Sequence, residues 1–173
     1  MQTGLTIIRI RIIIHIIRFR TKEGSEMEQS AANYLEVYNQ LYKEMDNLYH
    51  LYAKRHGISD AHLWLLYSLY EKQEHTQREI STLWHYPPQT VNSALKSLEK
   101  RGLIALKPLP GNRKNKLVGL TQEGKAVAEQ IIGPLIAAEQ KAFCGLKKEE
   151  REELLSLTSR YAELLQAAIE EKR

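Results

Sequence analysis

The chain has very little cysteine, since Cys144 is the only one among 173 residues. A single thiol cannot form an intramolecular disulfide or a cysteine-rich zinc site, which excludes a small secreted scaffold stapled by disulfides. The composition therefore favours a reducing compartment, and we expect a cytoplasmic protein. Cys144 falls near the end of an expected helix, and we interpret it as a packing residue rather than a redox centre.

Motifs of catalysis and cofactor binding are also missing. The six histidines show no HExxH spacing, and there is no nucleophile elbow, phosphate-cradling glycine loop or dinucleotide fingerprint. His50 and His62 could approach each other across helices, but we interpret both as hydrogen-bonded or exposed side chains. We therefore expect a protein that is not an enzyme and that uses no metal and no cofactor.

No apolar run is long enough to span a bilayer, which needs about 20 mostly apolar residues, and we expect no membrane partner. The isoleucine-rich stretch 7–20 contains four arginines and lacks the small-residue cleavage site of a secretory signal. We expect residues 1–26 to be a disordered extension or the product of an upstream start codon, with Met27 as the natural start. A genuine basic arm is the alternative, and peripheral membrane attachment through residues 1–20 depends on it.

Positive charge is concentrated in the middle of the chain. Residues 76–121 hold eight Lys or Arg against two Glu, a net +6, although the formal net charge of the whole chain is only +4. Residues 1–26 carry +3, and the segments 27–75 and 122–173 together carry −5. A basic segment between acidic arms is typical of a surface that binds phosphate groups.

Apolar spacing predicts long helices towards both ends of the chain. Steps of three and four between apolar residues indicate helices over 27–55 and 147–171, each with an apolar stripe along one face. Thr121 is a suitable cap for a third long helix, which runs to about residue 143. We expect Gly133 and Pro134 to interrupt that helix.

Shorter elements are predicted between these helices. Ser59 can cap a leucine-rich helix, and Thr76 with Glu79 forms a capping box for a short helix over 77–85. Pro88 suits the first position of a helix that runs to residue 101. Two strand candidates, 103–107 and 116–120, are joined by a basic segment rich in turn formers. The residues expected to be buried by the two helices are Ile80, Leu83, Trp84, Val91, Ala94, Leu95 and Leu98.

Three short helices followed by a two-stranded ribbon form the winged helix-turn-helix arrangement. In this arrangement the later helix lies in the major groove, and its N-terminal residues contact base edges. Helix 88–101 has small polar side chains on its outer face instead of Glu/Lys pairs, which favours base contact over a merely solvated face. The predicted base-reading residues are Gln89, Thr90, Asn92, Ser93 and Lys96. The predicted wing, 108–116, places Arg113, Lys114 and Lys116 on the DNA backbone and in the minor groove.

These segments resemble the MarR-type (multiple-antibiotic-resistance regulator) transcription factors over about residues 30–173. The most specific stretch is 88–124, where LEKRGLI and LTQEG stand at the end of the recognition helix and at the junction between wing and next helix. The resemblance implies a fold that is mainly α with a small β-hairpin wing. It implies one domain, 27–173. Within that domain it implies a winged helix-turn-helix over about 58–121 and dimerisation helices over about 27–56 and 122–172.

The resemblance also implies partners. They are a second copy of the chain, double-stranded DNA with a pseudo-palindromic site, and usually a small-molecule ligand that releases a repressor from DNA. In the family, ligands lie between the dimerisation helices and the winged domain. The candidate lining residues there are Tyr38, Tyr42, Leu65, Tyr67 and Trp84.

The chain departs from the family pattern in two places. The Asp-x-Arg signature of the wing reads Asn112-Arg113-Lys114, and lysine lacks the planar fork of arginine. Either minor-groove selectivity is weaker, or Arg113 takes this role. The first helix also lacks the cysteine of oxidant-responsive members. The alternative function is a ligand-binding or protein-interaction module of the same fold that no longer reads DNA.

Overall fold

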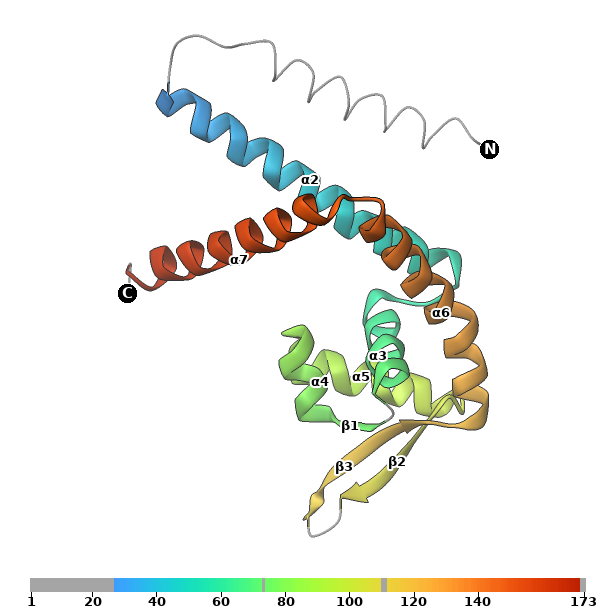
Figure 1. The fold of residues 1–173 in the computed structure, drawn as a ribbon. Helices are drawn as coiled ribbons and strands as arrows, with labels where there is room; N and C mark the ends of the chain where they lie inside the picture. Colours follow the sequence, from blue (N-terminus) through green and yellow to red (C-terminus); the bar gives the residue numbers. More distant parts are fainter. Residues whose placement is uncertain (1–26, 73, 110–111, 172–173) are drawn as a thin grey trace. The chain divides into compact units, whose positions relative to one another are not determined.

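The computed structural model describes residues 27–72, 74–109 and 112–171, with the backbone alone for 27–32 and 112–115. The expectations for residues 1–26 lie outside the described residues. The chain divides into two compact units, residues 1–48 and 49–173, and each is described by itself. The fold is mainly helical with one small antiparallel sheet, which confirms the predicted fold class (Figure 1).

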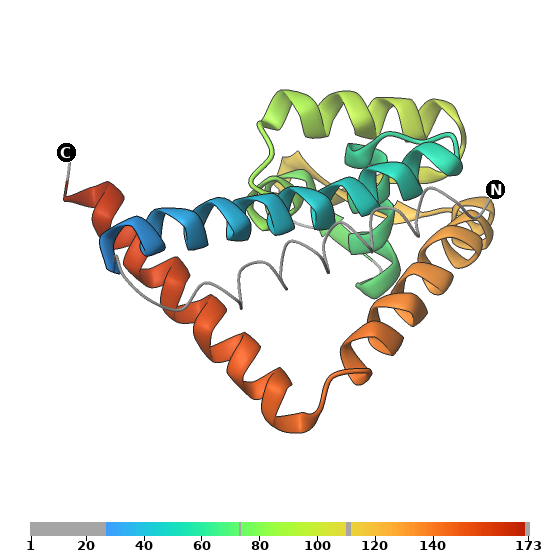
Figure 2. The same cartoon turned by 90° about the horizontal axis from the view of Figure 1, so that it is seen from above.

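The predicted helices are all present in the described part of the chain, and Figure 2 shows α6 and α7 as separate helices. None of the described helices is long and apolar enough to cross a membrane. The elements in chain order are α2 (Met27–Arg55), α3 (Asp60–Glu71), β1 (Glu74–Thr76), α4 (Gln77–Trp84), α5 (Pro88–Lys100), β2 (Ile104–Leu109), β3 (Asn112–Leu120), α6 (Gln122–Cys144) and α7 (Lys148–Glu170).

Local capping signals set the starts of four helices as predicted. The Ser59 hydroxyl accepts from the His62 amide at the start of α3, and Pro88 is the first residue of α5. Thr121 Oγ1 accepts from the Gly124 amide at 3.0 Å at the start of α6. The predicted capping box of α4 is complete. The Ser59, Thr76 and Thr121 side chains satisfy backbone amides that have no partner within their own helix, whereas Pro88 suits its position because it has no amide N–H to satisfy.

The capping box of α4 links stability to pH. Thr76 N donates to Glu79 Oε2 at 2.6 Å, and Glu79 N donates to Thr76 Oγ1 at 3.2 Å. Hydrogen bonding to the Thr76 backbone favours the charged carboxylate and holds the pKa of Glu79 below its usual value. Because the folded pKa is the lower one, this contribution to stability is complete above the usual pKa of a glutamate. It is lost as the pH falls through the lowered pKa.

Variants of the two capping residues are expected to show this linkage. Thr76→Ala should lower the free energy of unfolding by about 1 kcal/mol at neutral pH. Glu79→Gln should be destabilising at neutral pH, with a deficit that shrinks towards about pH 3. Urea unfolding at both pH values measures the effect, with Glu71→Gln on exposed α3 surface as the matched control. A Glu79→Gln deficit of equal size at both pH values would contradict the role of the carboxylate.

The core lies where α3, α5, α6 and the sheet meet. The apolar face predicted for α5 is buried, and Ile80 of α4 is buried beside it. Leu83 differs from the prediction, because its side chain is 54% exposed. Ile80 and the half-buried Trp84 are four residues apart and share the inner side of the short helix, which leaves Leu83 on another side.

The sheet has three strands rather than two, in the order β1-β3-β2. Its additional strand, β1, falls in a polar segment without strand-like alternation and pairs antiparallel with β3, Thr76 opposite Leu117. β2 and β3 are also longer than predicted, and Pro108 lies in β2 opposite Lys116. A proline has no N–H to donate, and the edge position of β2 makes that absence tolerable.

Helix α6 runs without a break from Gln122 to Cys144, so the predicted interruption at Gly133 and Pro134 is wrong. A proline inside a helix removes one hydrogen bond and clashes with the preceding turn. Burial of Ile132 and Leu135 on either side of this pair holds the helix against the core and offsets that cost.

Candidate nucleic-acid interface

The outer face of α5 carries the residues predicted to read DNA sequence. All five of these side chains are exposed, while the opposite face of α5 is buried in the core. Gln89, Ser93 and Lys96, three or four residues apart, form the outermost row of the helix. Thr90 lies on one side of this row and Asn92 on the other. The structure therefore presents the predicted residues on one exposed surface of a firmly anchored helix.

A cavity of about 320 Å³ lies along one flank of α5. Asn92 and Lys96 line it, together with Lys116 of β3, so the structure brings a predicted wing residue beside two predicted base-reading residues. Gln77 and Arg78 at the start of α4 line the same cavity. Sequence reasoning did not select either of them. The capping box could have pointed to them, because it marks the start of α4. In a helix-turn-helix unit the helix before the recognition helix crosses the DNA backbone, so residues at its start are candidates for phosphate contact.

A second hollow, of about 450 Å³, is shallow and open to solvent and lies along the opposite flank of α5. Gln89, Thr90 and Ser93 line it, and Ser59 and His62 contribute from the start of α3. The five predicted residues are thus divided between two cavities. The helical period alone places these five residues on two flanks of α5. The residues that face them across each cavity come from the start of α3 on one flank and from α4 and the sheet on the other.

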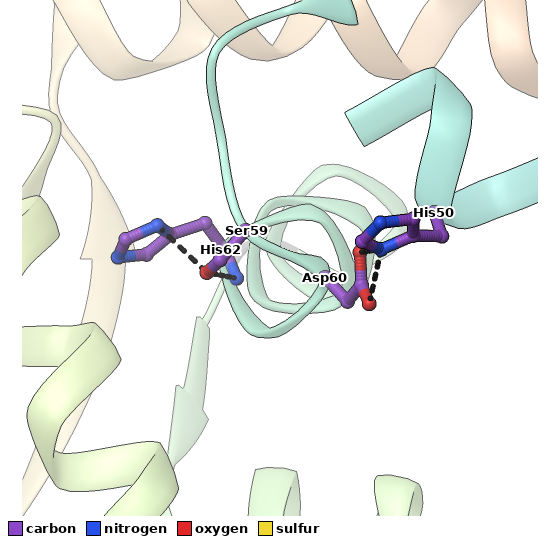
Figure 3. Close-up of polar contacts among 4 residues, drawn as sticks. All are labelled: His50, Ser59, Asp60 and His62. Atoms are coloured by element: carbon purple, nitrogen blue, oxygen red, sulfur yellow. Dashed lines mark hydrogen bonds and ion pairs between the residues drawn. The ribbon is translucent and has the colours of Figure 1, made fainter. Parts of the chain in front are cut away.

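The two histidines near this surface have separate partners on opposite sides of the start of α3 (Figure 3). His50 Nδ1 lies 3.1 Å from Asp60 Oδ2, and His62 Nδ1 lies 3.1 Å from Ser59 Oγ. Burial lowers the pKa of His62, and the positive charge of Arg101 lowers it further. His62 is therefore neutral at pH 7. Among the described residues, no group of three or more His, Cys, Asp or Glu could hold a metal ion.

The tip of the wing is described only in part. Arg113 and Lys114 belong to β3, but their side chains lie outside the described residues, so their minor-groove role stays a prediction. Lys116 is exposed. The strands continue to Leu109 and from Asn112, which makes the connection between them shorter than the predicted turn segment.

Two of the candidate ligand residues, Tyr67 and Trp84, belong to an aromatic cluster between α3 and α4. Trp84 stacks on Trp64 with ring centroids 4.5 Å apart, and Trp84 Nε1 donates to Ser68 Oγ at 2.6 Å. Tyr67 OH donates to Glu139 Oε2 of α6 at 2.8 Å. Burial, reinforced by the Glu139 carboxylate, raises the pKa of Tyr67 and raises the pKa of Tyr49 to about 12.

The other candidate ligand residues lie elsewhere. Leu65 is buried in the core. Tyr38 and Tyr42 are exposed residues of α2 in the other compact unit. Only Leu65, Tyr67 and Trp84 therefore belong to the same unit as the winged domain.

Comparison with known proteins gives a fold and a partial match to a family model. The model of the MarR family matches residues 56–114. The chain is similar to a MarR family regulator from Neisseria meningitidis, with 24% identity, 80% of this chain and 98% of that chain covered, and a TM-score of 0.70. It is also similar to the S. aureus MepR–DNA complex, with 22% identity, coverage of 76% and 97%, and a TM-score of 0.62. For YusO from Bacillus subtilis the identity is 21%, the coverage is 80% and 99%, and the TM-score is 0.55.

These similarities confirm the MarR-type winged-helix fold and the resemblance found in the sequence. No curated protein matches the chain in sequence.

Proposed function

We propose that this chain, a MarR-type winged-helix protein, is a dimeric regulator of transcription that binds double-stranded DNA with sequence specificity. The observation that carries the proposal is the exposed row of small polar side chains on α5, whose other face is fixed in the core. Such a helix fits the major groove, where amide and hydroxyl groups pair with base edges. One of the similar solved structures, MepR, is a complex with DNA.

Replacing Asn92 tests the base-reading role directly. Asn92→Ala should weaken binding to a specific duplex by about 1–3 kcal/mol, because an asparagine amide can pair bidentately with adenine. The loss on non-specific DNA should be smaller. Fluorescence anisotropy with a duplex selected by the protein from a random pool measures both, and Gln130→Ala on the exposed surface of α6 is the control. Equal losses on the two kinds of DNA would argue against base contact.

We propose that α2 and α7 form the interface of a homodimer. α7 has no buried residue, and several large apolar side chains of both helices are exposed. Extended apolar surface of this kind is typical of protein interfaces. The exposed side chains of α7 are Leu154, Leu155, Leu157, Leu164, Leu165 and Ile169. A two-fold dimer would match a pseudo-palindromic DNA site, and light scattering coupled to gel filtration tests its mass.

We further propose a cytoplasmic repressor that a small-molecule ligand releases from DNA. The candidate ligand residues are those named above: Tyr38, Tyr42, Leu65, Tyr67 and Trp84. Trp84 supports this proposal because it joins α4 to α3, so a ligand in contact with it would act on the helix that precedes α5. Quenching of tryptophan fluorescence by a compound that also dissociates the DNA complex tests this step.

The alternative is a ligand-binding or protein-interaction module that does not read DNA. A band-shift assay with DNA from the region upstream of the chain's own gene separates the two functions. Retardation at low salt supports the regulator, and its absence supports the alternative.

A further inference from the structure

Helix α5 separates two cavities of different chemical character. We call the cavity of about 320 Å³ the cationic groove, since Arg78, Lys96 and Lys116 line it. We call the cavity of about 450 Å³ the hydroxyl groove, since Ser59, Thr90, Ser93 and Ser97 line it, with Gln89 and His62. α5 contributes residues to both, so any ligand that covers α5 meets both grooves.

The cationic groove concentrates positive charge that has no partner in the described part of the chain. Its three cations come from three different elements, α4, α5 and β3, and Glu99 is the only carboxylate among the described residues that line it. No ion pair within 4.0 Å forms at Arg78, Lys96 or Lys116 among the described residues. By contrast, Lys107 on the neighbouring strand β2 is paired with Glu74 at 3.1 Å.

Three like charges around one hollow repel each other, so they do not stabilise the folded chain. An anion placed between these three side chains would be attracted to all of them and would offset their mutual repulsion. Arginine is well suited to phosphate, because its planar fork can donate two parallel hydrogen bonds to the phosphate oxygens. Gln77 and Asn92, which line the same groove, add uncharged donors. This set of groups fits a phosphodiester.

The hydroxyl groove offers hydrogen bonds without charge. No Lys or Arg of the described part of the chain lines it. Its one titratable side chain, His62, has a pKa lowered by burial and by the charge of Arg101, so it adds no positive charge at neutral pH. Serine, threonine and glutamine side chains can still donate to phosphate oxygens.

We propose that the cationic groove binds backbone phosphates of one DNA strand, with Arg78 as a positioning contact, while the hydroxyl groove faces the other strand. The inference rests on the proposed function, since it requires α5 to lie in the major groove. A helix in that groove has a phosphodiester strand on each side. The two flanks of α5 therefore meet two different strands. Cationic contacts release counterions, and this release makes binding depend on salt. Around α5, that salt dependence therefore arises mainly from the strand at the cationic groove.

The test uses the full chain and a duplex that the chain itself selects from a random-sequence pool. In wild type we measure the slope of log K against log salt. Arg78→Gln should lower its magnitude by about 0.9 for each protomer bound, the contribution of one neutralised phosphate. Lys141→Gln, an exposed cation of α6, removes the same charge away from both grooves and should leave the slope unchanged. Thermal unfolding of each variant confirms that it is folded.

Neutral methylphosphonate linkages, placed in one strand of one half-site at a time, then identify the strand. The half-site is the unit of the test because the two-fold axis of a dimer presents the cationic grooves of its two protomers to different strands. Neutralising the strand at the cationic groove should lower the slope in wild type. The same modified strand should change the slope by about one unit less in Arg78→Gln than in wild type, because the variant has already lost the Arg78 contact. Neutralising the other strand should weaken binding with little change of slope. Equal changes of slope for the two strands would overturn the proposed asymmetry.

The remaining outcomes separate this inference from the proposed function. If the pool yields no enriched duplex, the proposed function fails. If a duplex is bound but Arg78→Gln, Lys96→Gln and Lys116→Gln all keep the wild-type slope, the cationic groove is not a phosphate site, and DNA binding stands. Sodium phosphate, titrated at constant ionic strength and followed by NMR, tests for a free anion. Saturable shifts at Arg78 without DNA would assign the groove to free phosphate and overturn the duplex proposal.

Discussion

An Arg113→Ala, Lys114→Ala double variant is expected to bind operator DNA with a salt-dependence slope smaller by almost two units for each protomer bound. Each cation that neutralises a phosphate releases counterions and contributes about 0.9 to the slope of log K against log salt. Both residues belong to β3 beside the tip of the wing, where the chain has three positive charges within residues 112–116. Anisotropy titrations between about 50 and 200 mM salt cover the range in which such slopes are measured.

The matched control for this double variant is Lys125→Ala, Lys141→Ala on exposed positions of α6. It lowers the net charge by the same amount, so the comparison separates local contacts from the long-range field of the protein. A slope that falls equally in both double variants would show that the wing makes no phosphate contact of its own.

Replacing Gly124 with alanine is expected to destabilise the winged domain by roughly 3 kcal/mol, the upper end of the usual cost of overpacking. A Cβ at this position would lie 1.8 Å from the carbonyl oxygen of Leu103, which is backbone and cannot rotate away. The same carbonyl accepts the Thr121 amide at 3.1 Å, and Thr121 Oγ1 donates to the Gly102 carbonyl at 2.7 Å. Moving α6 outward to make room would break these hydrogen bonds.

Urea unfolding followed by circular dichroism measures this effect, with exposed Gln122→Ala in the same turn of α6 as the control. The control should lie within about 0.5 kcal/mol of wild type, as is usual for surface substitutions. The Gly124 variant should also bind DNA more weakly, because the exit of α5 and the start of α6 meet at this point. A Gly124→Ala protein as stable as the control would rule out the close approach.

The features predicted correctly from the sequence are local ones. Thr76 with Glu79 and Thr121 cap amides within a few residues, and Pro88 acts through its own fixed backbone angle, so their effect is visible in a short window of sequence. The buried face of α5 follows from the helical period alone. The exposure of the five predicted base-reading residues follows from the same period.

The features missed from the sequence depend on distant partners. β1 has only three residues, too few to show alternation, and it exists because β3 offers it hydrogen bonds. The cationic groove brings Arg78 beside Lys116, residues that are adjacent only after the sheet has formed. The predicted break at Pro134 does not occur, because burial along α6 outweighs the loss of one helical hydrogen bond.

Strand β3 is paired on both sides along only part of its length, so the outer part of the wing projects from the sheet. β1 pairs β3 only from Leu117 to Gly119, whereas β3 continues outward to Asn112. At about 3.4 Å per residue, the tip therefore extends roughly 17 Å beyond the part of β3 that is paired on both sides. A rotation of the hairpin by about 10° about Leu117, where pairing on both sides ends, would displace the tip by about 3 Å, the length of a hydrogen bond. The start of α4 lies at the end of β1, so the capping box stands next to the part of the sheet from which the hairpin projects.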